Sequence, residues 1–121
     1  MTESEAQALL PELASSDSDR RLRAAVQLGV PGWSFAVPEL MRLAKSDPDE
    51  RVRRASISSL ASIGDMTAYP FLESLWKDHT EDSDVRQEAL EACDRMLDLD
   101  GSHEDTTQAP SRPRGDSQGG T

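Results

Sequence analysis

The residues best suited to chemistry are few in this chain and lie far apart. Cys93 is the single cysteine, so the chain can form neither an internal disulfide nor a zinc site that uses several cysteines. The two histidines, His79 and His103, are not at the short spacing of a metal-binding pair. Because no catalytic set can be assembled from these residues, we expect no catalytic residue, no metal site, no cofactor and no enzymatic activity.

Arginines are concentrated in one part of the chain, and the net charge of that part is opposite in sign to the net charge of the whole chain. The 121 residues include 13 Lys and Arg against 23 Asp and Glu, which gives a net charge of −10. Residues 20–54, in contrast, hold eight basic and four acidic side chains, for a net charge of +4. A basic patch can recognise an acidic protein surface or a phosphate backbone. The net charge of −10 over residues 65–105 disfavours nucleic acid, because a duplex would be repelled there.

Three segments that align as repeats must position these side chains. They begin at positions 9, 36 and 68, and each carries a proline near its start, namely Pro11, Pro38 and Pro70. The apolar anchors Leu22, Val52 and Val85 are separated by 30 and 33 residues. A period of this size indicates a stack of helical repeats.

Each repeat is expected to contain two helices. In the second repeat the first helix is predicted over residues 34–45. The second helix is predicted to open with Asp47 as its N-cap and Pro48 in its first position, with Glu50 completing a capping box, and to end at Gly64. Its buried stripe is predicted to consist of Val52, Ala55, Ser56, Leu60 and Ile63.

A charge pattern recurs where the second helix of each repeat begins. An aspartate precedes an arginine by four residues in three places, a spacing that favours an ion pair along a helix. We therefore expect structural ion pairs within Asp19–Arg23, Asp49–Arg53 and Asp82–Arg86.

The segment DPDERVRRASISSLASIGDMTAYPFLESL, which starts at Asp47, resembles HEAT repeats. The resemblance is to the short bacterial HEAT-like type first associated with phycobilisome lyases. It rests on Asp47–Pro48–Asp49, Val52–Arg53, Ala55, Leu60, Ile63–Gly64–Asp65, Pro70 and Leu72, and it extends over residues 5–98. The first repeat departs from the pattern, because its second helix is about two residues short and VPGW replaces the usual tight link. In the third repeat Cys93 stands where Leu60 stands in the second, so it is expected to be an inert core thiol.

This resemblance implies an all-α fold, an α-solenoid of about three HEAT-like helix pairs. We expect one domain over residues 1–99, with repeats at 5–29, 34–64 and 65–98. Residues 100–121 are rich in Gly, Pro, Ser and Thr and are predicted to form a disordered tail. No export signal or membrane span is recognisable, so a cytoplasmic location and no membrane contact are expected.

The two ends of such a stack have different expected surfaces. On the last helix, charged residues form the polar outer face that a terminal repeat needs; they are Asp84, Glu88, Glu91, Arg95 and Asp98. The first helix, with Ala6, Leu9, Leu10 and Leu13, is less polar. Its exposed side either docks a partner or a second copy, or is covered by the second helix of its own repeat, which we favour.

The resemblance also implies that second helices line the concave face of the stack. We therefore predict partner-binding residues there, namely Arg20, Arg21, Arg51 and Arg54. Trp33 follows a Pro–Gly turn, where it either covers the helix junction or anchors a partner. The expected function is a non-catalytic adaptor or scaffold that binds another protein, one with an acidic surface. The alternative is a subunit or accessory factor of a bilin (phycobilisome) lyase-type complex. The oligomeric state is left open.

Overall fold

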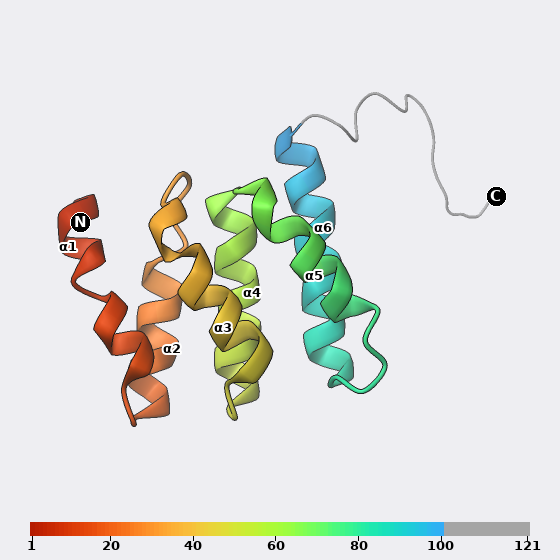
Figure 1. Ribbon diagram of the computed structural model, residues 1–121, viewed down its shortest axis with the longest axis horizontal. Coiled ribbons are helices and arrows are strands. Elements are labelled where there is room, and N and C mark those ends of the chain that lie inside the picture. The colour runs from red at the N-terminus through yellow and green to blue at the C-terminus, as the bar shows by residue number, and fades with distance from the viewer. Residues whose placement is uncertain (101–121) are drawn as a thin grey trace.

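The computed structural model describes residues 1–100 as helices arranged in two layers (Figure 1). Residues 101–121, which hold most of the predicted disordered tail, lie outside the described residues. Between positions 1 and 100 no helix is both long and apolar enough to cross a membrane. The elements are α1 (Glu3–Gln7), η1 (Leu10–Ala14), α2 (Ser18–Gln27), η2 (Ser34–Ala36), α3 (Val37–Ser46), α4 (Glu50–Ile63), η3 (Met66–Ala68), α5 (Tyr69–Trp76) and α6 (Ser83–Asp100), where η denotes a 3-10 helix.

The helices form three stacked pairs, as the sequence predicts (Figure 1). In one layer α2 packs against α4 and α4 against α6. In the other layer η1, α3 and α5 each pack on the second helix of their own pair. We call the solvent-facing side of α2, α4 and α6 the second-helix face. The fold is therefore an all-α solenoid, and α6 extends one residue past the predicted boundary at position 99.

An aspartate at the same place fixes the start of each second helix. Backbone N–H groups donate to Asp17, Asp49 and Asp82 from the residue two positions later, at 2.9, 2.9 and 2.8 Å. These three residues are 32 and 33 positions apart, so the predicted alignment through Leu22 is wrong by two residues. The prediction that Asp47 caps α4 is also wrong, because Asp49 is the N-cap and the helix begins at Glu50.

The predicted aspartate–arginine pairs within single helices are also wrong. None of the three forms an ion pair within the described residues. The arginine four positions after each N-cap, which is Arg21 rather than Arg23 in the first repeat, turns back to a main-chain carbonyl. Arg21 Nη1 donates to Ser15 O at 2.9 Å, and Arg53 Nη1 donates to Asp47 O at 2.8 Å. In the third repeat Arg86 Nε donates to Trp76 O at 3.1 Å. These arginines tie the turn between the two helices to the start of the second helix.

Two of these arginines, Arg21 and Arg53, also connect one repeat to the next. Arg21 Nε and Nη2 donate to the two carboxylate oxygens of Asp47 at 2.7 and 3.1 Å. Arg53 Nη2 lies 3.5 Å from Glu81 Oε1 in the following repeat. The first pair is well shielded from water, since the side chains of Arg21 and Asp47 are 13% and 2% exposed. We call Arg21, Arg53 and Arg86 the arginine ladder.

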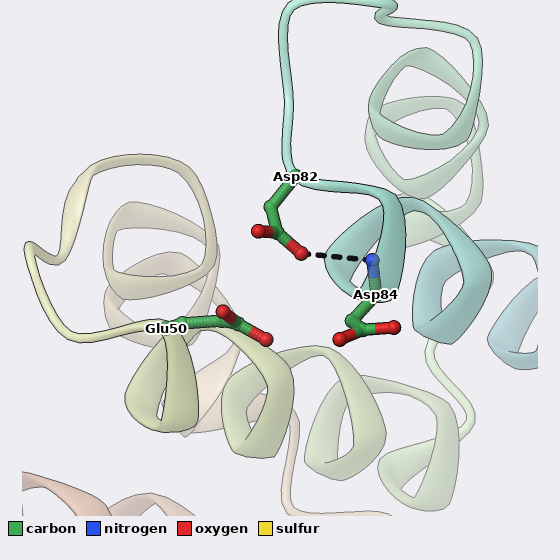
Figure 2. Close-up of side chains that lie close together, drawn as sticks. All are labelled: Glu50, Asp82 and Asp84. Carbon is green, nitrogen blue, oxygen red and sulfur yellow. Dashed lines mark hydrogen bonds between the residues drawn. The ribbon is translucent and has the colours of Figure 1, made fainter.

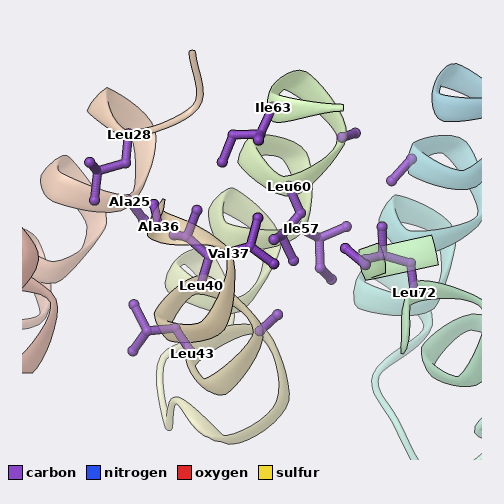
Figure 3. Close-up of a cluster of buried hydrophobic side chains, with 14 of the residues drawn as sticks. Ala25, Leu28, Ala36, Val37, Leu40, Leu43, Ile57, Leu60, Ile63 and Leu72 are labelled. Atoms are coloured by element: carbon purple, nitrogen blue, oxygen red, sulfur yellow. The ribbon is translucent and has the colours of Figure 1, made fainter. Parts of the chain in front are cut away.

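The apolar core runs through all three repeats without interruption (Figure 3). Four residues of the predicted stripe on α4, Val52, Ser56, Leu60 and Ile63, are buried, and Ala55 is half-buried. The prediction missed Ile57, which is fully buried although it lies off that stripe. Ile57 is covered because α4 has a neighbour on each side, α2 and α6, as well as α3.

The short helix α2 is completed by a side chain of its neighbour. α2 has 10 residues against 14 in α4, and Gly29 N donates to Val26 O rather than to Ala25 O. The buried Ser59 hydroxyl of α4 donates to Ala25 O at 2.6 Å instead. A Cβ atom at Gly29 would lie 2.6 Å from Ser59 Oγ, so this close approach requires glycine.

Two buried serines of α4 are expected to respond oppositely to replacement by alanine. Ser59→Ala leaves Ala25 O buried without its donor, which should lower the free energy of unfolding by about 1–3 kcal/mol. The Ser56 hydroxyl is buried and has no hydrogen-bond partner in the part of the chain that the structure describes. Ser56→Ala should therefore leave stability unchanged or raise it by up to about 1 kcal/mol. Urea unfolding followed by circular dichroism measures both changes, and an equal loss of stability in the two variants would contradict this assignment.

Breaking the Arg21–Asp47 pair should destabilise the fold far more than breaking a surface pair. Arg21→Gln leaves the Asp47 carboxylate buried beside an uncharged amide, so we expect a loss of about 3 kcal/mol. The control is Arg42→Gln, which removes a 2.8 Å pair with Glu39 whose side chains are 50% and 46% exposed. That variant should lose less than about 0.5 kcal/mol. If the two variants lost a similar free energy of unfolding, the Arg21–Asp47 pair would contribute no more stability than a surface ion pair.

Candidate functional site

The second-helix face carries two adjoining shallow hollows. On α2 a hollow of 500 Å³ is lined by Asp19, Leu22, Arg23 and Val26. On α4 and α6 a hollow of 290 Å³ is lined by Arg51, Arg54, Ala55, Ser58 and Glu88. The α4 side chains share one side of the helix because they are spaced three or four residues apart. This face presents apolar and charged groups from all three repeats side by side.

Two arginines of α4 bridge the neighbouring second helices. Arg51 Nη2 lies 3.0 Å from Asp19 Oδ1 on α2 and 2.8 Å from Asp49 Oδ2. Arg54 lies 3.7 Å from Glu88 on α6 and 3.7 Å from Glu50. The side chains of both arginines are about half exposed, so these pairs are accessible to water. Each arginine therefore meets carboxylates from two helices.

Hydrogen bonds donated by Arg51 lower the pKa of Asp49. Donation from the Arg51 guanidinium, and then from its backbone N–H, lowers the pKa of Asp49 to about 2. Asp49 is therefore charged throughout the neutral range. The basic charge of Arg51 is compensated locally, which the sequence pattern of residues 20–54 did not indicate.

The predicted partner-binding arginines separate into three environments. Arg51 and Arg54 lie together on the second-helix face. Arg20 lies instead in a groove at the N-terminal end of the stack, together with Leu9 of the first helical segment. Arg21 belongs to the arginine ladder, and its guanidinium is held by Asp47. The first repeat differs because its second helix starts two residues earlier than the alignment through Leu22 predicts.

Trp33 lies at the junction between the first two repeats. It is the N-cap residue of η2, and its ring centroid is 5.8 Å from that of Phe35. Both rings are half-buried against the apolar core. This position agrees with the first of the two roles considered for Trp33, covering the helix junction.

Sequence reasoning missed the exposed apolar residue of the second-helix face. Val26 is 60% exposed, although large apolar side chains in this fold are otherwise mostly covered. The available signal was its place between Arg23 and Gln27, on the polar side of α2. Together with Leu22, Val26 forms the apolar part of the hollow on α2, which is rimmed by Asp19 and Arg23.

Three carboxylates lie close together where α4 and α6 begin (Figure 2). One oxygen from each of Glu50, Asp82 and Asp84 lies within 4.8 Å of the others. Asp82 accepts the Asp84 N–H, and Glu50 pairs with Arg54. Acidic side chains are favoured in the first turn of a helix because they face the positive end of its dipole. The helix starts therefore account for this cluster.

Cys93 lies in the apolar core, as expected for a residue in the place of Leu60. It is 3% exposed. Burial, followed by the charges of Glu73 and Asp94, raises the pKa of its thiol to about 11. The thiolate, which is the nucleophilic form, is thus scarce at neutral pH.

Thiol labelling should report this burial directly. At pH 8 the folded protein should react with a thiol reagent at least about 100-fold more slowly than the urea-unfolded chain, because a pKa raised by two units lowers the thiolate population by that factor and burial limits access. The rate in the folded protein should rise with pH up to about 11, well above the range of a free thiol. Equal rates for the folded and unfolded protein would contradict a core position for Cys93.

Comparison with known proteins agrees with this architecture. A search of curated proteins finds no match. The family profile that describes HEAT repeats matches residues 6–96, which include α2 to α5 entirely and most of α6. That match covers well over half of the chain and spans the three helix pairs connected by the arginine ladder. The chain therefore belongs to the HEAT-repeat family.

Proposed function

We propose that this protein is a non-catalytic adaptor or scaffold that binds a partner protein on its second-helix face. HEAT repeats generally mediate protein–protein interactions, which supports a role in binding. The observation that carries the proposal is that the second-helix face combines the exposed Val26 of α2 with the bridging arginines Arg51 and Arg54 of α4. A stack held together by buried contacts presents this face with little loss of conformational entropy on binding.

The chemistry of the face defines the kind of partner that it fits. Leu22 and Val26 offer apolar area, and the small residues Ala55 and Ser58 let a partner approach α4 closely. The exposed ion pairs of Arg51 and Arg54 are each worth less than about 1 kcal/mol. A carboxylate of the partner can therefore replace Asp19 or Glu88 as the acceptor with little net change. The partner that fits is a protein with an apolar side chain flanked by acidic residues.

The other predicted contacts have different parts in this proposal. Arg21 supports the face indirectly, because its pair with Asp47 fixes α2 relative to α4. Trp33 covers the junction between the first two repeats and so stabilises the same arrangement. The bilin lyase-type alternative stays a prediction, because neither the fold nor the family match assigns chromophore handling to a residue. We locate the partner contact at Val26, Arg51 and Arg54.

Variants of the second-helix face should lose the partner while keeping the fold. The baits are the wild-type chain, Val26→Asp, and Arg51→Gln combined with Arg54→Gln. We expect the amount of a protein captured by the wild type from lysate of the source cell to fall at least about tenfold with either variant, which corresponds to about 1.4 kcal/mol. Val26→Asp places a carboxylate where the partner is acidic, and the arginine variant leaves Asp19 and Glu88 to repel the partner's carboxylates. Quantitative mass spectrometry measures the captured amounts.

The matched control for this experiment is Arg42→Gln on the opposite layer. Arg42 is an exposed arginine of α3 whose one ion-pair partner within residues 1–100 is Glu39, so its replacement removes a guanidinium without touching the second-helix face. Capture should be unchanged with this bait, and all baits should show the same helicity. If the surface variants capture the same proteins as the wild type, binding on this face is wrong.

A further inference from the structure

The contact between the first two repeats shows which side of a second helix faces its neighbour. Ser59 of α4 donates to Ala25 O of α2 and lies against Gly29. Counted from the N-caps, Ser59 is ten residues along its helix, whereas Ala25 and Gly29 are eight and twelve residues after Asp17. Position ten therefore faces the preceding repeat, and positions eight and twelve face the following one.

The same positions lie open at the two ends of the stack. In α2, position ten is Gln27, which is exposed at the N-terminal end. In α6, positions eight and twelve are Leu90 and Asp94 at the C-terminal end. Leu90 is 37% exposed, whereas Ile57, at the same position of α4, is fully buried. The ends thus present the two surfaces that meet inside the molecule between repeats.

The N-terminal end is a groove whose charged lining consists of two arginines and one glutamate, Glu12, so its net charge is basic. Its volume is 510 Å³, and its lining residues all belong to the first repeat. Arg20 and Arg23 flank Gln27 there, and neither forms an ion pair within residues 1–100. Leu9 and Ala24 supply its apolar part. Arg20 occupies the position of Val52 and Val85, which are fully buried because a preceding repeat covers them.

The C-terminal end has the complementary character. Leu90 is one of only three large apolar side chains that are exposed among the described residues. Asp94 is also exposed, and it occupies the position at which Gly29 and Ala61 lie against the next repeat. This end therefore combines an apolar side chain with a carboxylate. The opposite end combines apolar side chains with two guanidinium groups, which outnumber the carboxylate of Glu12.

We propose that a second copy of this chain docks head to tail, with the N-terminal end of one copy on the C-terminal end of the other. Leu90 then enters the groove near Leu9 and Ala24. Arg20 and Arg23 meet Asp94, and their long aliphatic stems cover apolar surface while the charged groups remain near water. Two identical C-terminal ends would instead place acidic repeats together, so charge favours the head-to-tail arrangement.

This contact is weaker than the contacts between repeats inside the chain. Asp47, the carboxylate that receives Arg21, lies two residues before an N-cap, and the corresponding residue of the first repeat is Ser15. Arg86 of one copy consequently finds no carboxylate at that position of the next. A head-to-tail contact also leaves one end of each kind free, so chains grow without closing. Association is therefore reversible and open-ended.

Sedimentation velocity of the full chain tests this proposal. From about 10 μM to about 1 mM, the average mass should rise continuously, without the plateau that a closed dimer would give. Arg20→Glu with Arg23→Glu should weaken association at least about tenfold, because two acidic ends then meet. Asp94→Arg should have the same effect, because two basic ends then meet. Mixing these two variants should restore association, since the acidic end of one fits the basic end of the other.

A matched variant separates this contact from the effect of total charge. Arg42→Glu with Lys45→Glu changes the net charge by the same amount on α3, away from both ends. It should associate like the wild type. A mass that stays monomeric at every concentration would overturn the proposal. A plateau at the dimer, equal weakening in the α3 control, or no recovery on mixing would overturn it as well.

Discussion

The architecture of this protein depends on a buried ion pair that passes from one repeat to the next. Arg21 is held by three acceptors, namely both oxygens of Asp47 and the main-chain carbonyl of Ser15. The Asp47 carboxylate also accepts the N–H of its neighbour Asp49, so the pair leaves few groups unsatisfied. A buried charge pair stabilises a protein only when its geometry and hydrogen bonds are this complete. The pair therefore sets the distance and angle between the first two repeats.

The second-helix face inherits its geometry from that arrangement. Val26 is presented by α2, whereas Arg51 and Arg54 are presented by α4, so their spacing is fixed by the packing of one repeat on the other. The contact of Ser59 with Ala25 O and the close approach at Gly29 act at the same junction. A face built across repeats in this way keeps its shape before a partner arrives, which reduces the entropy lost on binding.

The sequence predicts the fold well because its signals are local. Apolar spacing, prolines near helix starts and the glycine after α4 indicate helix pairs without any knowledge of distant contacts. The site is harder to predict, because pairing between repeats depends on register. An error of two residues in the first repeat placed Arg21 among the partner-binding residues of the concave face and hid its contact with Asp47. The compensation of Arg51 by Asp19 arises between residues 32 positions apart, and no local pattern reports it.

Native-state hydrogen exchange tests most directly whether the arginine ladder makes the repeats one rigid unit. In the wild-type protein, amides in the middle of α2 should open with nearly the same free energy as those of α4, because the two helices unfold together. In Arg21→Gln, protection of α2 should fall well below that of α6, where the ladder contact of Arg86 is intact. If α2 already exchanges independently in the wild type, or if the variant loses protection evenly, the ladder does not hold the repeats together.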